Sequence, residues 1–406
     1  MQTEAAVFQE ATLRQTLHTS IGADRIRLQI SNTFGASELP ITLASIALPA
    51  GGQAGVGEID VATLVGLTFN NGSESITVPA GEVVYTDPVD FPIGPQSMLT
   101  VSLYSQAGQA GASITGHPGS RTTSWMQQGN YVNEASVSQS SVTHWYFVSA
   151  VEAWAPPTMS ALVILGDSIS DGRGSVDNEN NRWPDLLLAR MQENGITNVA
   201  VCNQAAGGNA VLAGGLGPPL IERYQRDLLG VAGAKYALVF EGVNDIGPAA
   251  SDAATQQRVG SDLTAAFATI ASAAKGTAEM EGGFAAVIGA TITPFGGVGQ
   301  PYSDPSREQT RQAVNAWILG GGEGSFDATV DFAALLADPA DPSVLAGQYD
   351  GGDHLHPTVA GYQAMADGFP LDIFGGGGAG NASATATAPP SNHRRGYRGD
   401  QWLFAY

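Results

Sequence analysis

Residues 1–155 alternate between apolar and polar positions in short runs, as half-buried β-strands do. Residues 25–30 and 99–103 place an apolar side chain at every second position, and residues 144–148 form a further strand-like run. Clusters of Gly, Pro and Asn, which favour turns, separate these runs, for example at 49–52 and 92–95. Short strands divided by turns predict an all-β sandwich or jelly-roll domain over residues 1–155.

Pro156-Pro157 marks a boundary, because two consecutive prolines fit neither a strand interior nor a helix interior. The spacing of apolar residues along the chain changes after it. Beyond this boundary, short apolar runs that predict buried strands alternate with longer stretches that predict helices. The predicted strands are 161–165, 198–202, 236–241, 284–292 and 329–332, and the predicted helices are 183–194, 255–275, 305–319 and 358–368. This alternation predicts a doubly wound parallel sheet, and we assign residues 156–374 to an α/β domain.

The chain changes character again at residue 375. From there it consists largely of Gly, Ala, Ser, Thr and Pro, and then carries a short basic run around Arg394-Arg395. A segment of this composition buries too little apolar surface to offset the entropy lost on ordering. We therefore predict a disordered low-complexity tail over residues 375–406.

Composition narrows the class of partner. The 38 acidic and 17 basic residues give a net charge of −21, which argues against nucleic acid or an anionic membrane surface. No apolar run approaches the roughly 18 residues of a membrane-spanning helix. Charged residues make up only 14% of the chain, a composition typical of secreted proteins, so we expect an extracellular protein whose leader is not present in this sequence. The single cysteine, Cys202, excludes an internal disulfide framework.

Three of the predicted strands lead into residues that can bind a ligand or take part in catalysis. Gly166-Asp167-Ser168 follows the first strand and carries a hydroxyl at the edge of the sheet where open α/β folds bind ligands. The second strand is followed by Gly207-Gly208, and the third by a loop containing Asn244. Glycine lets a backbone N–H approach a ligand closely, and an asparagine amide adds another donor. With the Ser168 N–H, these groups predict an oxyanion hole.

The loop after the last strand, residues 350–357, contains two histidines and two aspartates. His354 and His356 are the only histidines between Pro157 and the predicted tail, and either one could accept the serine proton. Asp350, Asp353 and the two histidines could instead bind a metal, but their crowding into one loop argues against a metal site. We expect no metal and no organic cofactor.

Four segments carry a resemblance to a known family: those that contain Ser168, Gly208, Asn244 and the loop 350–357. Together and in this order they resemble the GDSL family, also called SGNH hydrolases, over about residues 160–370. The resemblance implies an SGNH hydrolase fold, a flavodoxin-like doubly wound parallel sheet, with Ser168, Asp353 and His356 as catalytic residues. It also implies an oxyanion hole formed by Ser168, Gly208 and Asn244. The Asp-x-x-His spacing of the family selects His356 over His354. Residues 181–185 and 241–247 resemble an extracellular subgroup that carries an N-terminal β-domain before the hydrolase.

The expected function is a serine ester hydrolase that works through a Ser-His-Asp triad and an acyl-enzyme. Its substrate would be a small-molecule or polysaccharide ester. Loops 214–219 and 294–299 are rich in glycine and sparsely apolar, which favours short acyl esters such as O-acetyl groups on carbohydrate. Alternatives are a lipase or acylhydrolase acting on lipid esters, an acyltransferase, and a non-catalytic carbohydrate-binding protein. The oligomeric state is left open.

The β-domain supplies no predicted catalytic residue. We expect its histidines, His18, His117 and His144, to be ordinary strand or loop residues. Arg121 lies in a turn-rich segment and could reach the mouth of the active site, but we assign it no role.

Overall fold

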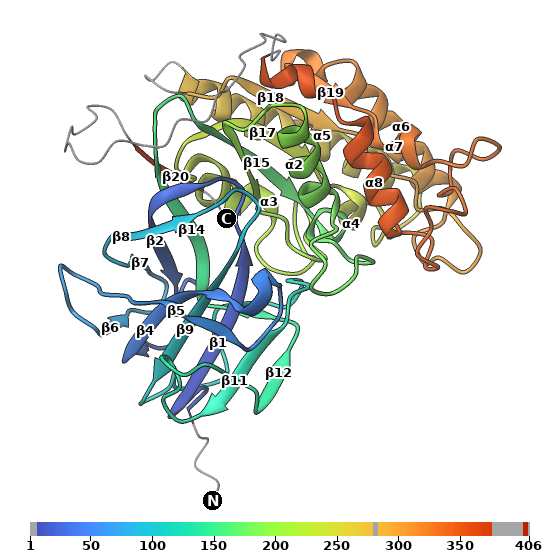
Figure 1. The fold of residues 1–406 in the computed structure, drawn as a ribbon. Helices are drawn as coiled ribbons and strands as arrows, with labels where there is room; N and C mark the ends of the chain where they lie inside the picture. Colours follow the sequence, from blue (N-terminus) through green and yellow to red (C-terminus); the bar gives the residue numbers. More distant parts are fainter. Residues whose placement is uncertain (1–5, 279–282, 376–400, 405–406) are drawn as a thin grey trace, which may run out of the picture.

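The computed structural model describes residues 6–278, 283–375 and 401–404. An N-terminal region of antiparallel sheets lies beside a parallel sheet that is covered by helices (Figure 1). This arrangement confirms the predicted fold class, a doubly wound parallel sheet preceded by a β-domain. Within the described residues, no helix is both long enough and apolar enough to cross a membrane.

Two sheets of the β-domain enclose a common apolar core. The larger has the order β12-β11-β1-β9-β4-β5 and comprises Ala11–His18 (β1), Leu43–Pro49 (β4), Ile59–Gly66 (β5), Met98–Ser105 (β9), Ser124–Gln128 (β11) and Ser140–Val142 (β12). The second has the order β20-β14-β2-β7, with β8 also pairing with β2, and comprises Ala23–Ser31 (β2), Val83–Tyr85 (β7), Val89–Ile93 (β8), Val148–Ala155 (β14) and Gln401–Phe404 (β20). Leu17 and Val101 from the first sheet and Leu28 and Val151 from the second share one buried cluster, which makes the domain a sandwich.

Two short strand pairs complete this region. Leu39–Ile41 (β3) pairs with Ile76–Val78 (β6), and Gly116–His117 (β10) pairs with Trp145–Tyr146 (β13). The β10–β13 pair contacts the α/β region, because His117 of β10 lies 2.6 Å from Asp171.

The parallel sheet has the strand order β16-β15-β17-β18-β19. Its strands are Ser160–Gly166 (β15), Val199–Asn203 (β16), Ala234–Phe240 (β17), Ala286–Ala290 (β18) and Ala328–Val330 (β19), and every pairing is parallel. Numbered by position in the sheet's own chain order, this is 2-1-3-4-5, the flavodoxin-like order. In that order the chain reverses direction across the sheet beside β15, so a ligand crevice is expected at the carboxyl end of β15.

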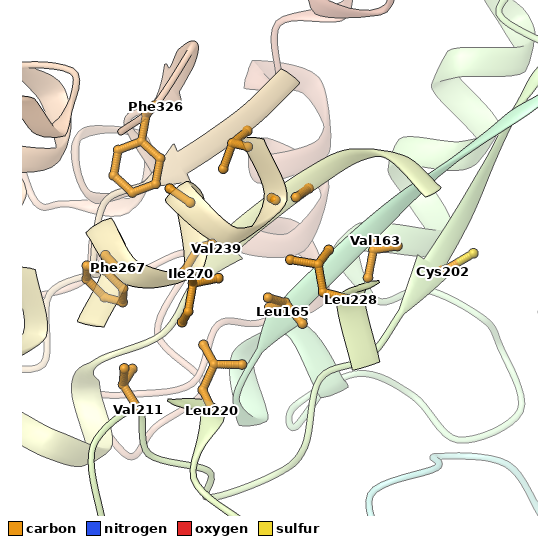
Figure 2. Close-up of a cluster of buried hydrophobic side chains, with 14 of the residues drawn as sticks. Val163, Leu165, Cys202, Val211, Leu220, Leu228, Val239, Phe267, Ile270 and Phe326 are labelled. Atoms are coloured by element: carbon orange, nitrogen blue, oxygen red, sulfur yellow. The ribbon is translucent and has the colours of Figure 1, made fainter. Parts of the chain in front are cut away.

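Helices cover both faces of the parallel sheet. Trp183–Glu193 (α2), Phe332–Leu336 (α7) and Val359–Gly368 (α8) pack on one face, and Leu220–Tyr224 (α3), Ala253–Ala278 (α5) and Pro305–Leu319 (α6) pack on the other (Figure 1). Successive side chains of β15 alternate between these two cores. Leu162 and Ile164 join the α2–α8 side, whereas Val163 and Leu165 lie with Phe267 of α5 in the cluster that Figure 2 shows. The apolar run of β15 is therefore buried on both faces, as its composition predicts.

The two regions also share buried surface. Pro156-Pro157 lies between β14 and β15, but Ala153 and Ala155 before it and Ala161 and Val163 after it belong to the same buried cluster. The connection is thus packed on both sides and does not act as a free linker.

Part of the segment that we expected to be disordered is instead a strand. Gln401–Phe404 forms β20, which pairs antiparallel with β14 and places Trp402 opposite Trp154. The Arg27 guanidinium lies 4.4 Å from the centre of the Trp402 ring and 4.2 Å from that of the Tyr85 ring, so cation–π contacts hold β20 to the sheet. Residues 376–400 and 405–406, with the basic run, lie outside the described residues.

Candidate active site

Ser168 is the first residue of α1 (Ser168–Asp171), directly after β15. The Asp167 carboxylate caps this short helix by accepting the Ile169 backbone N–H at 2.9 Å, so the strand-to-helix turn is held from within. Burial raises the pKa of Asp167 to about 7. Ser168 is half-buried, whereas Ser170, two residues further on, is fully buried and accepts the indole N–H of Trp183 at 3.1 Å. Ser168 is therefore the accessible hydroxyl of the pair.

His356 and Asp353 extend from Ser168 in a continuous hydrogen-bonded chain. His356 Nε2 lies 2.8 Å from Ser168 Oγ, and His356 Nδ1 lies 2.6 Å from Asp353 Oδ2. The other Asp353 oxygen accepts the backbone N–H groups of His356 at 2.9 Å and Leu355 at 3.1 Å, which fixes the carboxylate in the loop. The predicted residues 168, 353 and 356 thus meet at one site, although Ser168 and His356 lie 188 residues apart in the sequence.

The two acid–base groups that are hydrogen-bonded in series to Ser168, His356 and Asp353, have shifted pKa values. Burial lowers the pKa of His356, and the hydrogen bond to Asp353 only partly compensates. Burial acts to raise the pKa of Asp353, but the hydrogen bonds from the His356 backbone N–H and imidazole outweigh it, so this pKa lies below its ordinary value. At neutral pH the imidazole is therefore neutral, with one nitrogen able to accept a proton, and the carboxylate is charged.

His354 forms a separate pair and does not contact Ser168. Its Nδ1 lies 2.5 Å from Asp350 Oδ2, and its side chain is 39% exposed beside the backbone of Gly297. The choice of His356 over His354 as the partner of Ser168 agrees with this geometry. Among the residues that the structure describes, no group of three or more His, Cys, Asp or Glu side chains is arranged to hold a metal ion.

The predicted oxyanion residues come from two neighbouring loops. Asn209 N–H bonds to the Ala206 carbonyl at 3.1 Å and closes a tight turn in which Gly208 has φ +74°. A side chain at position 208 would be strained, and its Cβ would lie 2.9 Å from Leu216 Cδ1. Asn244, in α4 (Val243–Ile246), donates one amide N–H to the Asn209 carbonyl at 2.9 Å. An amide has two such hydrogens, so one is left for a ligand.

A buried arginine, which the sequence analysis did not single out, connects the strand ends under these loops. Arg223 of α3 pairs with Glu241 Oε1 at 2.6 Å, and the two side chains are 3% and 0% exposed. The same guanidinium donates to Asn209 Oδ1 at 2.8 Å, to the Gln204 carbonyl at 2.8 Å and to the Gly166 carbonyl at 3.3 Å. It therefore joins the ends of β15, β16 and β17 to the oxyanion loop.

Glu241 and a second acidic residue of these loops, Asp245, are both buried. Burial raises the pKa of Glu241 to about 8, and that of Asp245 to about 6 although its carboxylate accepts the backbone N–H groups of Val211 and Leu212 at 2.9 Å each. Asp245 thus has a structural role in shaping the loop after Asn209. The only sequence signal for this network was the presence of charged residues next to buried strands in a chain with few charges.

The β-domain also reaches the loops around the site, a possibility that the sequence raised for Arg121 but not for His117. His117 Nε2 lies 2.6 Å from Asp171 Oδ1, at the end of the helix that begins with Ser168. Arg121 donates to the Ser175 carbonyl and pairs with Asp177 at 2.9 Å, so it contacts the loop after α1. Neither residue belongs to a motif, and both contacts join segments that are distant in sequence.

Comparison with known proteins identifies the region that carries the site. Residues 164–364 match the family model described as the GDSL-like Lipase/Acylhydrolase family. No curated protein matches the chain significantly. Among solved structures, the chain is similar to a putative lipolytic protein of the G-D-S-L family from Desulfitobacterium hafniense DCB-2, at 19% identity and a TM-score of 0.38, covering 51% of this chain and 96% of that one.

Two further solved structures are similar over a comparable share of the chain. One is the lipase/acylhydrolase from Enterococcus faecalis, at 20% identity, a TM-score of 0.38 and coverage of 53% of this chain and 94% of that one. The other is Axe2, an acetylxylan esterase from Geobacillus stearothermophilus, at 21% identity, a TM-score of 0.37 and coverage of 54% and 96%. By its match to the family model, the segment 164–364 of this chain is a domain of the GDSL-like lipase/acylhydrolase family.

Proposed function

We propose that the protein is a serine carboxylic-ester hydrolase with Ser168 as nucleophile, His356 as general base and Asp353 as the residue that orients the imidazole. The observation that carries this proposal is the chain of contacts from Ser168 Oγ to His356 Nε2 at 2.8 Å and from His356 Nδ1 to Asp353 Oδ2 at 2.6 Å. A nucleophile that contacts a base, which in turn contacts a carboxylate, is the arrangement required for acyl transfer through a covalent intermediate.

In the proposed reaction, Ser168 Oγ attacks the ester carbonyl carbon as His356 Nε2 takes the hydroxyl proton. The backbone N–H groups of Ser168 and Gly208 and the free amide N–H of Asn244 stabilise the negative oxygen of the tetrahedral intermediate. Collapse of this intermediate releases the alcohol, which receives the proton from His356. Water then attacks the acyl-enzyme as His356 takes one of its protons, and His356 returns that proton to Ser168 Oγ as the carboxylic acid leaves.

The proposed substrates are short acyl esters, among them O-acetyl groups on carbohydrate. The glycine-rich loops on either side of the site support this choice. A second candidate, lipid esters, is favoured by two side chains in these same loops. Leu216 is 68% exposed and packs over Gly208, and Val298 is 98% exposed next to Gly297. Exposed aliphatic side chains in loops close to the oxyanion turn and to His354 favour apolar acyl chains.

We also propose that the enzyme acts outside the cell on a small-molecule or polysaccharide ester. The low share of charged residues, 14%, supports an extracellular setting. The net charge of −21 disfavours polyanionic substrates.

Release of p-nitrophenol from acetate, butyrate and laurate esters tests the proposal. We expect turnover by the native protein that Ser168→Ala abolishes, with acetate and butyrate preferred over laurate. Laurate preference that Leu216→Ser selectively removes would favour the lipid candidate. A native protein without turnover on all three esters would refute the proposed function.

A further inference from the structure

One buried carboxylate, that of Asp171, connects the β-domain, the nucleophile helix and the oxyanion turn. Asp171 ends α1, three residues after Ser168, and its side chain is 7% exposed. Its Oδ1 lies 2.6 Å from His117 Nε2 in β10, and its Oδ2 accepts the Gly207 backbone N–H at 2.9 Å. Gly207 precedes Gly208, the predicted oxyanion donor, in the tight turn. Two hydrogen bonds, from His117 to Asp171 and from Gly207 to Asp171, therefore connect the β-domain to this turn.

The packing around Asp171 leaves space for this bridge only because glycines flank it. A Cβ on Gly119, two residues after His117, would lie 1.9 Å from Asp171 Oδ2, and one on Gly207 would lie 3.1 Å from the same atom. The backbone of the β-domain therefore closes directly over the carboxylate.

The imidazole of His117 is itself held in place. It packs edge-on against Trp145 of the paired strand, with ring centres 6.0 Å apart. The His117 side chain is 37% exposed; its partial loss of hydration and the nearby Arg182 work against protonation, but the charge and hydrogen bond of Asp171 outweigh both and raise the pKa of His117. A protonated ring donates a charge-assisted hydrogen bond, which is stronger than a neutral one.

We propose that His117 is a positioning residue for the oxyanion hole, acting through Asp171 on the turn that presents the Gly208 N–H; this inference rests on the proposed esterase function. Two consecutive glycines give the turn little conformational preference of its own, so its orientation depends on the groups that bind it. Fixed donors stabilise a developing oxyanion because they need no reorganisation during the reaction. The β-domain thereby contributes to turnover and is not only an attached binding or structural module.

The chain offers a matched control for this role. His18 of β1 pairs with Asp185 of α2 at 3.1 Å, and both side chains are 13% exposed. This pair also joins a β-domain imidazole to a carboxylate of the α/β region. Asp185 contacts Arg182 at 3.4 Å, and within the described residues no hydrogen bond joins Asp185 to the oxyanion turn, so loss of His18 weakens the interface without removing a hydrogen bond to that turn.

The test compares kcat, KM and melting temperature for four variants, with p-nitrophenyl acetate as substrate. Both His117→Ala and His117→Asn lose the hydrogen bond to Asp171. Alanine has no donor, and the asparagine side chain is too short to reach the carboxylate. We expect both to lower kcat roughly ten- to one-hundredfold with little change in KM, as for a misplaced donor that is still present. His117→Gln places an amide N–H near the position of Nε2 and should retain most of the native kcat. His18→Ala should keep the native kcat.

Two results would overturn the inference. One is a folded His117→Asn or His117→Ala with the native kcat. The other is His18→Ala lowering kcat as much as the His117 variants, which would show a general effect of the interface. If His117→Ala does not fold, the contrast between asparagine and glutamine at position 117 still decides the question. Absence of Ser168-dependent turnover in the native protein would instead refute the proposed function, so the two failures are distinguishable.

Discussion

Replacing Arg223 with methionine removes a buried cation from beneath the active site and keeps most of the side-chain volume. In the native protein the guanidinium pairs with Glu241 at 2.6 Å and donates to Asn209 Oδ1 at 2.8 Å. The substitution therefore leaves a carboxylate without its cation and an oxyanion-loop amide without its donor. We expect a loss of both stability and turnover.

The size of the stability loss follows from the burial of Glu241, whose side chain is 0% exposed. Removing one partner of a buried ion pair destabilises a protein by about 3–5 kcal/mol, because the remaining charge is desolvated and unpaired. Burial raises the pKa of Glu241 and the Arg223 guanidinium lowers it, so without Arg223 the carboxyl binds a proton more readily and relieves part of this penalty. We therefore expect the lower end of that range, about 3 kcal/mol.

Urea denaturation followed by circular dichroism at pH 7 measures this loss. The double variant Arg223→Met/Glu241→Leu removes both charges and should recover most of the lost stability, since replacing a buried pair with apolar side chains is often neutral. Arg226→Met is a matched control, because Arg226 pairs with Asp227 but its side chain is 44% exposed, and its loss should cost less than about 1 kcal/mol. An Arg223→Met variant no less stable than Arg226→Met would refute the reasoning.

Three further predictions concern the site, its pH dependence and the β-domain. Asn244→Ala removes one oxyanion donor and should lower kcat on p-nitrophenyl acetate on the order of a hundredfold, about 3 kcal/mol of barrier; a change below threefold would argue against Asn244 as a donor. Because burial lowers the pKa of His356, kcat/KM should stay level down to about pH 6.5, the ordinary imidazole value, and fall only below it; a fall that begins above pH 7 would contradict His356 as the base. Deletion of residues 1–155 exposes the cluster around Ala161 and Val163 and removes the partner of Asp171, so the remainder should aggregate or lose most turnover; a soluble and fully active remainder on size exclusion and ester assay would contradict this.

The elements around the site could be predicted because each has a strong local signal. The run 161–165 is apolar throughout, since β15 is buried on both faces, and the reactive groups follow directly where such strands end. Parallel strands bring their carboxyl ends to one edge of the sheet, so Ser168, Gly208 and Asn244 lie on loops that are neighbours in space. His356 could be selected over His354 by its spacing from Asp353, and the contact with Ser168 agrees.

The supporting contacts could not be predicted, because they join segments without a local pattern. His117 and Asp171 are 54 residues apart in the sequence and lie in different elements, β10 and α1. The sequence around each residue does not indicate that the two side chains meet. Arg223 and Glu241 depend in the same way on how α3 packs under the sheet.

Strand β20 was missed because its four residues follow a long low-complexity segment. Its sequence, Gln-Trp-Leu-Phe, did carry a signal, since three apolar residues in a row are unusual in a disordered tail. Composition averaged over the whole tail concealed this short run.

Capture of the nucleophile tests the central claim most directly. The native protein is incubated with a fluorophosphonate, which reacts with activated serines, and peptides are analysed by mass spectrometry. Because His356 and Asp353 activate only the serine that they contact, we predict a single adduct on Ser168, with Ser168→Ala and His356→Ala unlabelled. An adduct on Ser170 or another residue, or an active native protein that remains unlabelled, would contradict the account.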